Sequence, residues 1–498
     1  MLNRRTKTRR GLARPARMAV QQGSPRPMFA AGSDHGFVRT DENARLFAYE
    51  QKVKGAFARI EPFLQALSQQ QHEADFPRLA QQKAMTMLGF ELPEGFLKDT
   101  WIKPLDIGRI YAWCVFKTFR MMSDEFFTQH PLAGDDEGFQ RFSEECGFHL
   151  VDVSPCADGR LAHVVRYVLR LPYRMVRRKS FAGAMFDVDD SLAKWTEVEM
   201  QRFREGKPNL ASEPTRYLKV AVYHFSSGTA HEGCAAHGSD VNKASQAAWG
   251  RLQAFRQGVE NSYCCGASID LLLIGLDTDT DAIRLHLPDV DGNIDTELYI
   301  DAADVYESTR GLNVSDPQAW LVKYVSDAAS KAGFGPANEG MVRFSAQLLL
   351  NNLSQIDYVR RYHNGRYTDI GHQESFIGMG IGFEEIQLRN LTYFAYLSTV
   401  EEGAADLDVG IKIFSGLNVS RGLPIPVVIR CDYHACVPGA RERAVARCIQ
   451  LDKAFRARFQ HLVENDMLHT LLMVRDCEES SVAEKIACSA MIAQVGMH

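Results

Sequence analysis

The sequence lacks the long apolar runs that cross membranes. Its longest candidate, Ile269 to Leu276, has only the length of a strand, whereas a membrane-spanning helix needs roughly 18 or more apolar residues in succession. No secretory signal opens the chain. We therefore expect a soluble protein with no membrane partner.

Cysteine is also sparse. Eleven cysteines among 498 residues are too few for a disulfide scaffold. We expect most of them to be small buried side chains in a reducing compartment. A few remain available as metal ligands.

A strong net charge is missing as well. The formal net charge of -5 gives no reason to expect nucleic acid as a partner. The first residues are the exception, because they contain seven basic residues and no acidic one: Arg4, Arg5, Lys7, Arg9, Arg10, Arg14 and Arg17. Such a block repels itself and cannot bury a core, which predicts a disordered basic tail over residues 1–34. The tail is either a solubilising extension, a transit peptide or a docking arm for an acidic protein surface.

The length of the chain implies several domains. Apolar residues recur at helical spacing within 42–67, 78–88 and 107–122, which predicts a helical N-terminal domain over residues 35–135. Beyond it, short apolar runs alternate with helical patterns. This alternation predicts an α/β domain with parallel strands over residues 136–380. Ligands of such folds gather at the carboxyl ends of the strands.

The last part of the chain repeats this pattern. The predicted strand Arg216 to His224 is followed by a cysteine and a helix, and the same order follows Pro426 to His434. We interpret residues 381–498 as a duplicate that kept the fold and lost its metal site. In this interpretation Ser415 to Asn418 replaces a cysteine-containing turn, while Cys431, His434 and Cys436 line the inactive site.

The segment Cys156-Ala157-Asp158-Gly159-Arg160 directly follows a predicted strand. Cys156 offers a thiolate to zinc, and a catalytic zinc site keeps one of four positions open for water. Asp158 is placed to accept a hydrogen bond from that water, and the planar guanidinium of Arg160 suits a two-bond pairing with the carboxylate. Alone, so short a motif is more often a turn with a salt bridge.

Two further ligands are expected near the end of another predicted strand. His224 ends this strand and Cys234 follows in a loop, so that Cys, His and Cys form a three-ligand set. His231 competes with His224, because its spacing to Cys234 suits local chelation. His237 is either a proton-transfer group or a surface residue.

Several long motifs resemble the carboxysome shell carbonic anhydrases, a divergent branch of the beta class. They are Tyr223-His224-Phe225-Ser226-Ser227, His231 to Asp240, Cys264 to Asp270, and Leu276 to Ala282. The resemblance implies a helical N-terminal domain, a catalytic domain and a C-terminal copy without zinc. It also implies one Zn²⁺ per chain on Cys156, His224 and Cys234, with Asp158 and Arg160 as the supporting pair.

The activity implied by this resemblance is the reversible hydration of carbon dioxide to bicarbonate. The expected location is the carboxysome, where the enzyme would supply CO2 to Rubisco. The basic tail then becomes a candidate arm for Rubisco or shell proteins, and a homodimer or a larger assembly of dimers is expected.

Two other functions would also use a cysteine- and histidine-rich zinc site. A zinc deaminase would need His-x-Glu and a later Cys-x-x-Cys, but His231 and Glu232 are adjacent and no Cys-x-x-Cys occurs in the sequence. A structural or scaffolding protein with an inert zinc site stays open. Asp277, Asp279 and Asp281 imitate a calcium loop but lack its downstream acid. For His372 and Glu374, ordinary turn chemistry is favoured over a place at the rim of the site.

Overall fold

The computed structural model describes residues 36–98, 100, 102–126, 131–132, 135–172, 175–210, 212–263, 268–331, 338–368, 372–383, 386–477 and 482–491. The predicted basic tail lies outside these ranges, as do Cys264 and Cys265. Within these ranges, no helix has both the length and the apolar character needed to cross a membrane.

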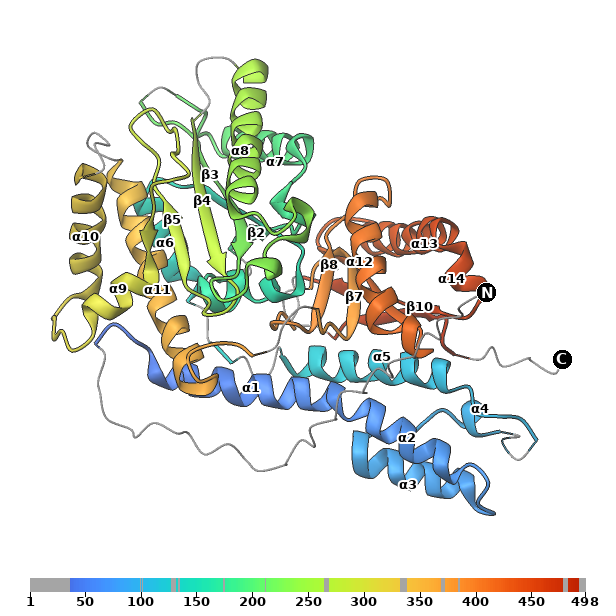
Figure 1. The fold of residues 1–498 in the computed structure, drawn as a ribbon. Coiled ribbons are helices and arrows are strands. Elements are labelled where there is room, and N and C mark those ends of the chain that lie inside the picture. The colour runs from blue at the N-terminus through green and yellow to red at the C-terminus, as the bar shows by residue number, and fades with distance from the viewer. Residues whose placement is uncertain are drawn as a thin grey trace, which may run out of the picture. The chain divides into compact units, whose positions relative to one another are not determined.

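The N-terminal region is helical, as predicted. Its helices are α1 (Thr40–Ala58), α2 (Ile60–Gln70), α3 (Phe76–Leu88), α4 (Glu94–Leu97) and α5 (Ile107–Phe126). The pattern over 42–67 breaks at Arg59 into two helices. The apolar sides of these helices share one core with the C-terminal sheet, where Phe119 of α5 packs edge-on against Phe376 with ring centroids 5.0 Å apart. Helices α1 and α5 lie side by side (Figure 1).

The first sheet follows α6 (Asp136–Glu145) and has the order β2-β1-β3-β4-β5-β6. Its strands are β1 (Leu150–Pro155), β2 (Val176–Arg178), β3 (Arg216–Phe225), β4 (Ser268–Asp277), β5 (Ile283–His286) and β6 (Ile300–Asp301). Strands β1 to β4 are parallel to one another. Residues 217–225 of β3 are all buried, as expected for a parallel strand that is covered on both faces.

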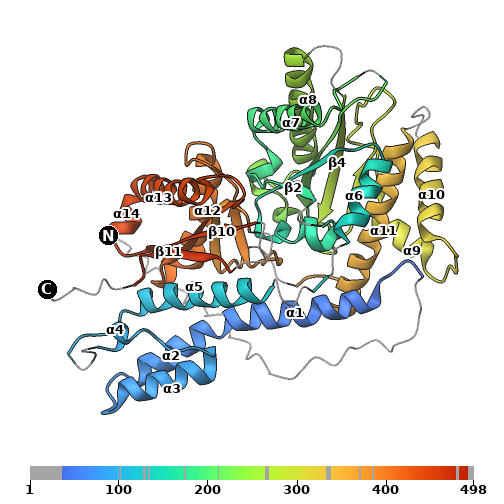
Figure 2. The same ribbon diagram turned by 180° about the vertical axis from the view of Figure 1, so that it is seen from behind.

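Helices cover both faces of this sheet. They are α7 (Val188–Arg204), α8 (Val241–Tyr263), α9 (Ala302–Thr309), α10 (Pro317–Lys331) and α11 (Glu339–Tyr362). Figures 1 and 2 show α7 and α8 on one side of the sheet, with α6, α9, α10 and α11 on the other. The pattern of strands alternating with helices is therefore confirmed.

The second sheet has the order β11-β10-β9-β7-β8. Its elements are β7 (Phe376–Ile381), β8 (Thr392–Ala395), α12 (Ala404–Leu417), β9 (Ile425–Tyr433), α13 (Ala440–Arg458), α14 (Gln460–Glu464), β10 (Leu468–Asp476) and β11 (Glu484–Cys488). Strands β7 to β10 are parallel and β11 is antiparallel to β10. The order and directions of these five strands match those of β1 to β5.

Two details of the expected repeat are corrected by this topology. Ser415 to Leu417 end helix α12 and do not form a turn equivalent to the one at Cys156. The strand that corresponds to β1 is β7, and its end leads into Gly382 and Phe383. The expected boundary at residue 380 falls inside β7, because the Gly-rich segment before Gly382 is a buried strand.

Candidate metal centre

Two parallel strands bring Cys156 and His224 to the same edge of the first sheet. Strand β1 ends at Pro155, which lies opposite Val222 of β3. The backbone N–H of Cys156 continues the ladder by donating to the carbonyl of Val222 at 3.1 Å. His224 is the next-to-last residue of β3. Both side chains therefore lie at the carboxyl edge of the sheet, where α/β folds bind ligands.

The loop between β3 and α8 carries Cys234. The chain bends tightly here, because the N–H groups of His237 and Ser239 both donate to the carbonyl of Cys234, at 3.0 and 2.9 Å. A Cβ atom on Gly233 would lie 2.8 Å from the carbonyl oxygen of Ser239, so this bend requires glycine. The bend turns the Cys234 side chain inward, where it is 3% exposed.

Acidic residues at the end of β4 hold the start of the same loop. Asp279 accepts from the N–H of Gly228 at 2.7 Å and from the hydroxyl of Ser226 at 2.9 Å. Asp277 accepts from the N–H of Ser227 at 3.1 Å. These carboxylates bind N–H and hydroxyl donors of the loop, as polar strand ends do. Holding this loop accounts for the aspartates at the end of β4, so a calcium site is not needed to explain them.

Three ligand atoms converge at this edge. The sulfurs of Cys156 and Cys234 and a ring nitrogen of His224 lie within 4.8 Å of one another. All three side chains are buried. His231, the rival of His224, is exposed and lies outside this group. His237 is half-buried, with Nε2 3.1 Å from the carbonyl oxygen of Gly183.

This donor set fits a zinc ion. Thiolate and imidazole are ligands that zinc prefers, and three protein ligands leave a fourth position for a small molecule. The Nδ1 atom of His224 is buried and has no hydrogen-bond partner among the described residues. An unpaired buried polar atom costs free energy, so the imidazole of His224 keeps a ring nitrogen whose bonding capacity no described residue uses.

The two sulfurs compete for one proton. A hydrogen bond to Cys234 and burial raise the pKa of the Cys156 thiol well above its ordinary value. The same hydrogen bond lowers the pKa of Cys234. A divalent cation replaces such a shared proton and favours both thiolates, since metal ligands bind deprotonated.

An ion pair lies beside the three ligands. Arg160 donates from Nε to Oδ1 of Asp158 at 2.9 Å and from Nη2 to Oδ2 at 2.8 Å. Burial alone would raise the pKa of Asp158, but Arg160 lowers it well below the ordinary range. Asp158 is therefore ionised at neutral pH and fixed in place, with Oδ2 3.5 Å from Nε2 of His224. A further hydrogen bond of 2.7 Å from Arg160 to the carbonyl of Glu232 ties the pair to the Cys234 loop.

The segment before β7 adds two residues that the sequence analysis assigned to an ordinary turn. Nδ1 of His372 lies 3.0 Å from Oε1 of Glu374, and this oxygen also accepts from the N–H of Gly159 at 3.2 Å. Burial lowers the pKa of His372, but Glu374 and Asp158 raise it to about 9. In the sequence, the one signal for this contact is the His-x-Glu spacing ahead of a strand. That spacing does not show that Glu374 binds the turn that follows Asp158.

Comparison with known proteins matches three family models along the chain. Their descriptions are Carboxysome Shell Carbonic Anhydrase, N-terminal, over residues 35–127; catalytic domain, over residues 138–372; and C-terminal, over residues 373–490. The chain belongs to the carboxysome shell carbonic anhydrase family. The resemblance of the motifs is thereby confirmed, and so is the prediction of a carbonic anhydrase enzyme.

Curated members of the carboxysome shell carbonic anhydrase family align with most of the chain. A carboxysome shell carbonic anhydrase of Parasynechococcus marenigrum is 53% identical over 458 residues, which are 91% of this chain and 78% of the relative. One of Prochlorococcus marinus is 50% identical over 92% of this chain and 90% of the relative. One of Halothiobacillus neapolitanus is 46% identical over 91% of this chain and 90% of the relative.

Proposed function

We propose that the chain is a zinc enzyme that reversibly hydrates carbon dioxide to bicarbonate, with one Zn²⁺ on Cys156, His224 and Cys234. The observation that carries this proposal is the convergence of the three ligand atoms within 4.8 Å, in buried surroundings. The set has the number and softness of ligands that a catalytic zinc site needs.

When bound, zinc supplies a Lewis acid that makes water a nucleophile near neutral pH. The protein's own part is to orient that water and to keep the site open. Asp158 is ionised and its two oxygens are held by Arg160, so that a fixed carboxylate can accept a hydrogen bond from the water. The same pairing keeps Asp158 from turning onto the ligand position that the substrate needs.

Metal content and hydration rate together test this proposal. Wild-type protein should hold one zinc per chain and hydrate CO2 in a stopped-flow assay, with activity lost to a chelator and restored by Zn²⁺. Cys156→Ala should lose both zinc and activity. Only His224 and Cys234 would remain as protein ligands, and two protein ligands bind zinc weakly. The control is Cys114→Ala, whose thiol is buried in α5 away from the ligand group, and it should retain both.

A zinc-loaded wild type without hydration activity would contradict the proposal. That result would favour a structural or scaffolding protein with an inert zinc site. Cys156→Ala with full zinc and full activity would contradict the ligand assignment itself.

We further propose that the second sheet is a duplicate of the catalytic one without a metal site. The matching strand order supports this. At the corresponding edge Arg430 pairs with Asp432 at 2.8 and 3.1 Å, and Arg475 lies 3.3 Å from the same carboxylate. These guanidinium groups supply positive charge beside an aspartate whose side chain is 7% exposed. We propose a division into a helical region up to about residue 135, a catalytic domain, and a C-terminal domain that begins before β7.

We also propose that the enzyme works in the carboxysome, supplies CO2 to Rubisco there, and assembles as a homodimer or a multiple of it. The relatives are named for the carboxysome shell, which supports this location. The basic residues before Ser33 are the proposed arm for Rubisco or a shell protein, since seven cations between residues 4 and 17 without an acid suit an acidic surface.

A further inference from the structure

A short loop between β2 and α7, residues 181–184, lies against the strand end that carries Cys156. The N–H of Phe181 donates to the carbonyl of Pro155 at 3.0 Å, and the carbonyl of Phe181 accepts from Ala157 at 3.0 Å. Two residues on, the N–H of Gly183 donates to the Cys156 sulfur at 3.3 Å. The loop therefore supplies a backbone hydrogen bond to a proposed zinc ligand.

The same loop contacts the turn that follows Cys234. The carbonyl of Gly183 accepts from Nε2 of His237 at 3.1 Å. Gly183 has φ of +65°, and a Cβ atom there would lie 2.7 Å from Nε2 of His237. Glycine is thus required by both the backbone conformation and the close approach. Residues 181–184 bridge the two segments that provide the sulfur ligands.

The loop is held from outside the catalytic domain. Oδ1 of Asp406, on helix α12 of the second sheet's domain, accepts from the N–H of Ala182 at 2.7 Å. Asp406 is 8% exposed, and its own carbonyl accepts from the hydroxyl of Tyr393 at 2.9 Å. Asp406 is therefore fixed to its own domain while it binds the loop.

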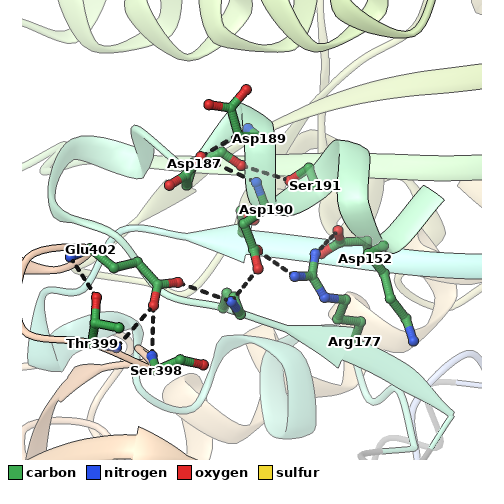
Figure 3. A network of polar contacts seen from close by, with 12 residues as sticks. Asp152, Arg177, Asp187, Asp189, Asp190, Ser191, Ser398, Thr399 and Glu402 are labelled. Carbon is green, nitrogen blue, oxygen red and sulfur yellow. Dashed lines mark hydrogen bonds and ion pairs between the residues drawn. The ribbon is translucent and has the colours of Figure 1, made fainter. Parts of the chain in front are cut away.

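A second contact between the domains lies just ahead of the loop. Nζ of Lys179 is 2.6 Å from Oδ1 of Asp190 and 3.3 Å from Oε1 of Glu402, which belongs to the C-terminal domain. Glu402 is held in turn by the N–H of Ser398 at 2.6 Å (Figure 3). The C-terminal domain thus contacts both ends of the segment 179–182, through Glu402 at Lys179 and through Asp406 at Ala182.

We propose that Asp406 is a positioning residue for the metal centre. By holding Ala182, it keeps the N–H of the next residue, Gly183, directed at the Cys156 sulfur. Such outer hydrogen bonds orient a ligand and set how strongly it donates to the metal, and their loss typically weakens metal binding 10–100-fold. This inference rests on the proposed function, because it takes Cys156 as a zinc ligand. By this proposal, the C-terminal domain helps to position a metal ligand of the catalytic domain.

Paired substitutions at Asp406 test the proposal in the full-length protein. Asp406→Ala removes the acceptor of the Ala182 N–H, whereas Asp406→Asn keeps an oxygen at Oδ1. The zinc dissociation constant is measured by competition with a chelator. The thiolate-to-metal charge-transfer absorption is measured on protein loaded with Co²⁺. Asp406→Ala should bind zinc at least about tenfold more weakly and show an altered Co²⁺ spectrum, while Asp406→Asn should match wild type in both.

Asp466→Ala is the matched control. Asp466 lies in the same domain and pairs with Arg109 of α5 at 2.8 and 2.9 Å, so its loss weakens a different contact of the C-terminal domain. Zinc affinity should not change in this variant. Should Asp406→Ala fail to fold by circular dichroism, Asp406→Leu serves instead, because it is uncharged, suits a buried position and cannot accept a hydrogen bond.

Three results would overturn the proposal: wild-type zinc affinity and Co²⁺ spectrum in folded Asp406→Ala or Asp406→Leu, an equal loss in Asp466→Ala, or an equal loss in folded Asp406→Asn. A failure of the proposed function is a separate outcome. In that case wild type itself would bind no zinc or hydrate no CO2.

Discussion

Nε2 of His372 lies 3.9 Å from Oδ2 of Asp158. His372 belongs to the segment that leads into the second sheet, while Asp158 follows the first strand of the catalytic sheet. With its pKa raised to about 9, the imidazole is protonated at neutral pH and places a positive charge beside the carboxylate. Asp158 is thus held by Arg160 on one side and faced by His372 on another.

His372→Gln is predicted to lower kcat for CO2 hydration roughly tenfold without loss of zinc. Glutamine keeps a hydrogen-bonding side chain but removes the positive charge that faces Asp158. Stopped-flow hydration and metal content on the same samples measure the two effects. His461→Gln, an exposed histidine in α14, is the control. An unchanged kcat in His372→Gln would show that Asp158 does not depend on this neighbour.

Asp158→Asn is predicted to keep zinc and to lose turnover by about 100-fold or more. The substitution leaves all three ligands in place, but the amide cannot accept as a carboxylate does and loses the charge that Arg160 binds. Zinc content and kcat are measured together. Asp240→Asn is the control, because Asp240 accepts from backbone N–H groups at the start of α8. Full hydration activity in Asp158→Asn would remove this residue from the mechanism.

The sequence predicted the strands, and it predicted the candidate ligand group that the structure brings together, because local patterns encode both. Cys156 and His224 each follow or end a buried apolar run, and parallel strands bring such positions to one edge. The sequence left His224 and His231 as alternatives, because local spacing does not show that the loop carrying Cys234 leaves His231 exposed and outside the group. His372 could not be assigned either, since its contact with Asp158 joins two distant segments. The prediction that Ser415 to Asn418 replaces the cysteine-containing turn was wrong. The strand that corresponds to β1 is β7, and Ser415 lies well beyond its end.

Removal of the residues before Ser33 is predicted to spare catalysis and to weaken encapsulation. Every residue placed at the candidate centre lies between Cys156 and Glu374, so the hydration rate per zinc should equal that of wild type. The fraction of enzyme that sediments with purified carboxysomes measures packaging. A variant in which the seven basic residues become glutamine separates charge from length. Unchanged packaging of the truncated protein would refute the docking arm.

Asp406 also gives a prediction for the pH dependence of stability. Burial raises the pKa of Asp406 to about 6, although the N–H of Ala182 opposes this shift. The folded state therefore binds a proton that the unfolded state releases between about pH 4 and pH 6. Stability falls as pH rises through this window, and the full cost, about 3 kcal/mol for a shift of roughly two units, applies above it.

Asp406→Asn removes this titration and keeps an acceptor for Ala182. Its thermal midpoint should exceed that of wild type at pH 7 to 8, and the difference should shrink as the pH approaches 4, where Asp406 is protonated in the folded state and about half protonated in the unfolded state. Asp408→Asn is the control, because Asp408 lies on the same helix but is exposed and paired with Arg458. The difference in thermal midpoint between Asp406→Asn and wild type could instead stay constant from pH 4 to 8. Ionised Asp406 would then carry no burial cost. The raised pKa would then not describe this carboxyl.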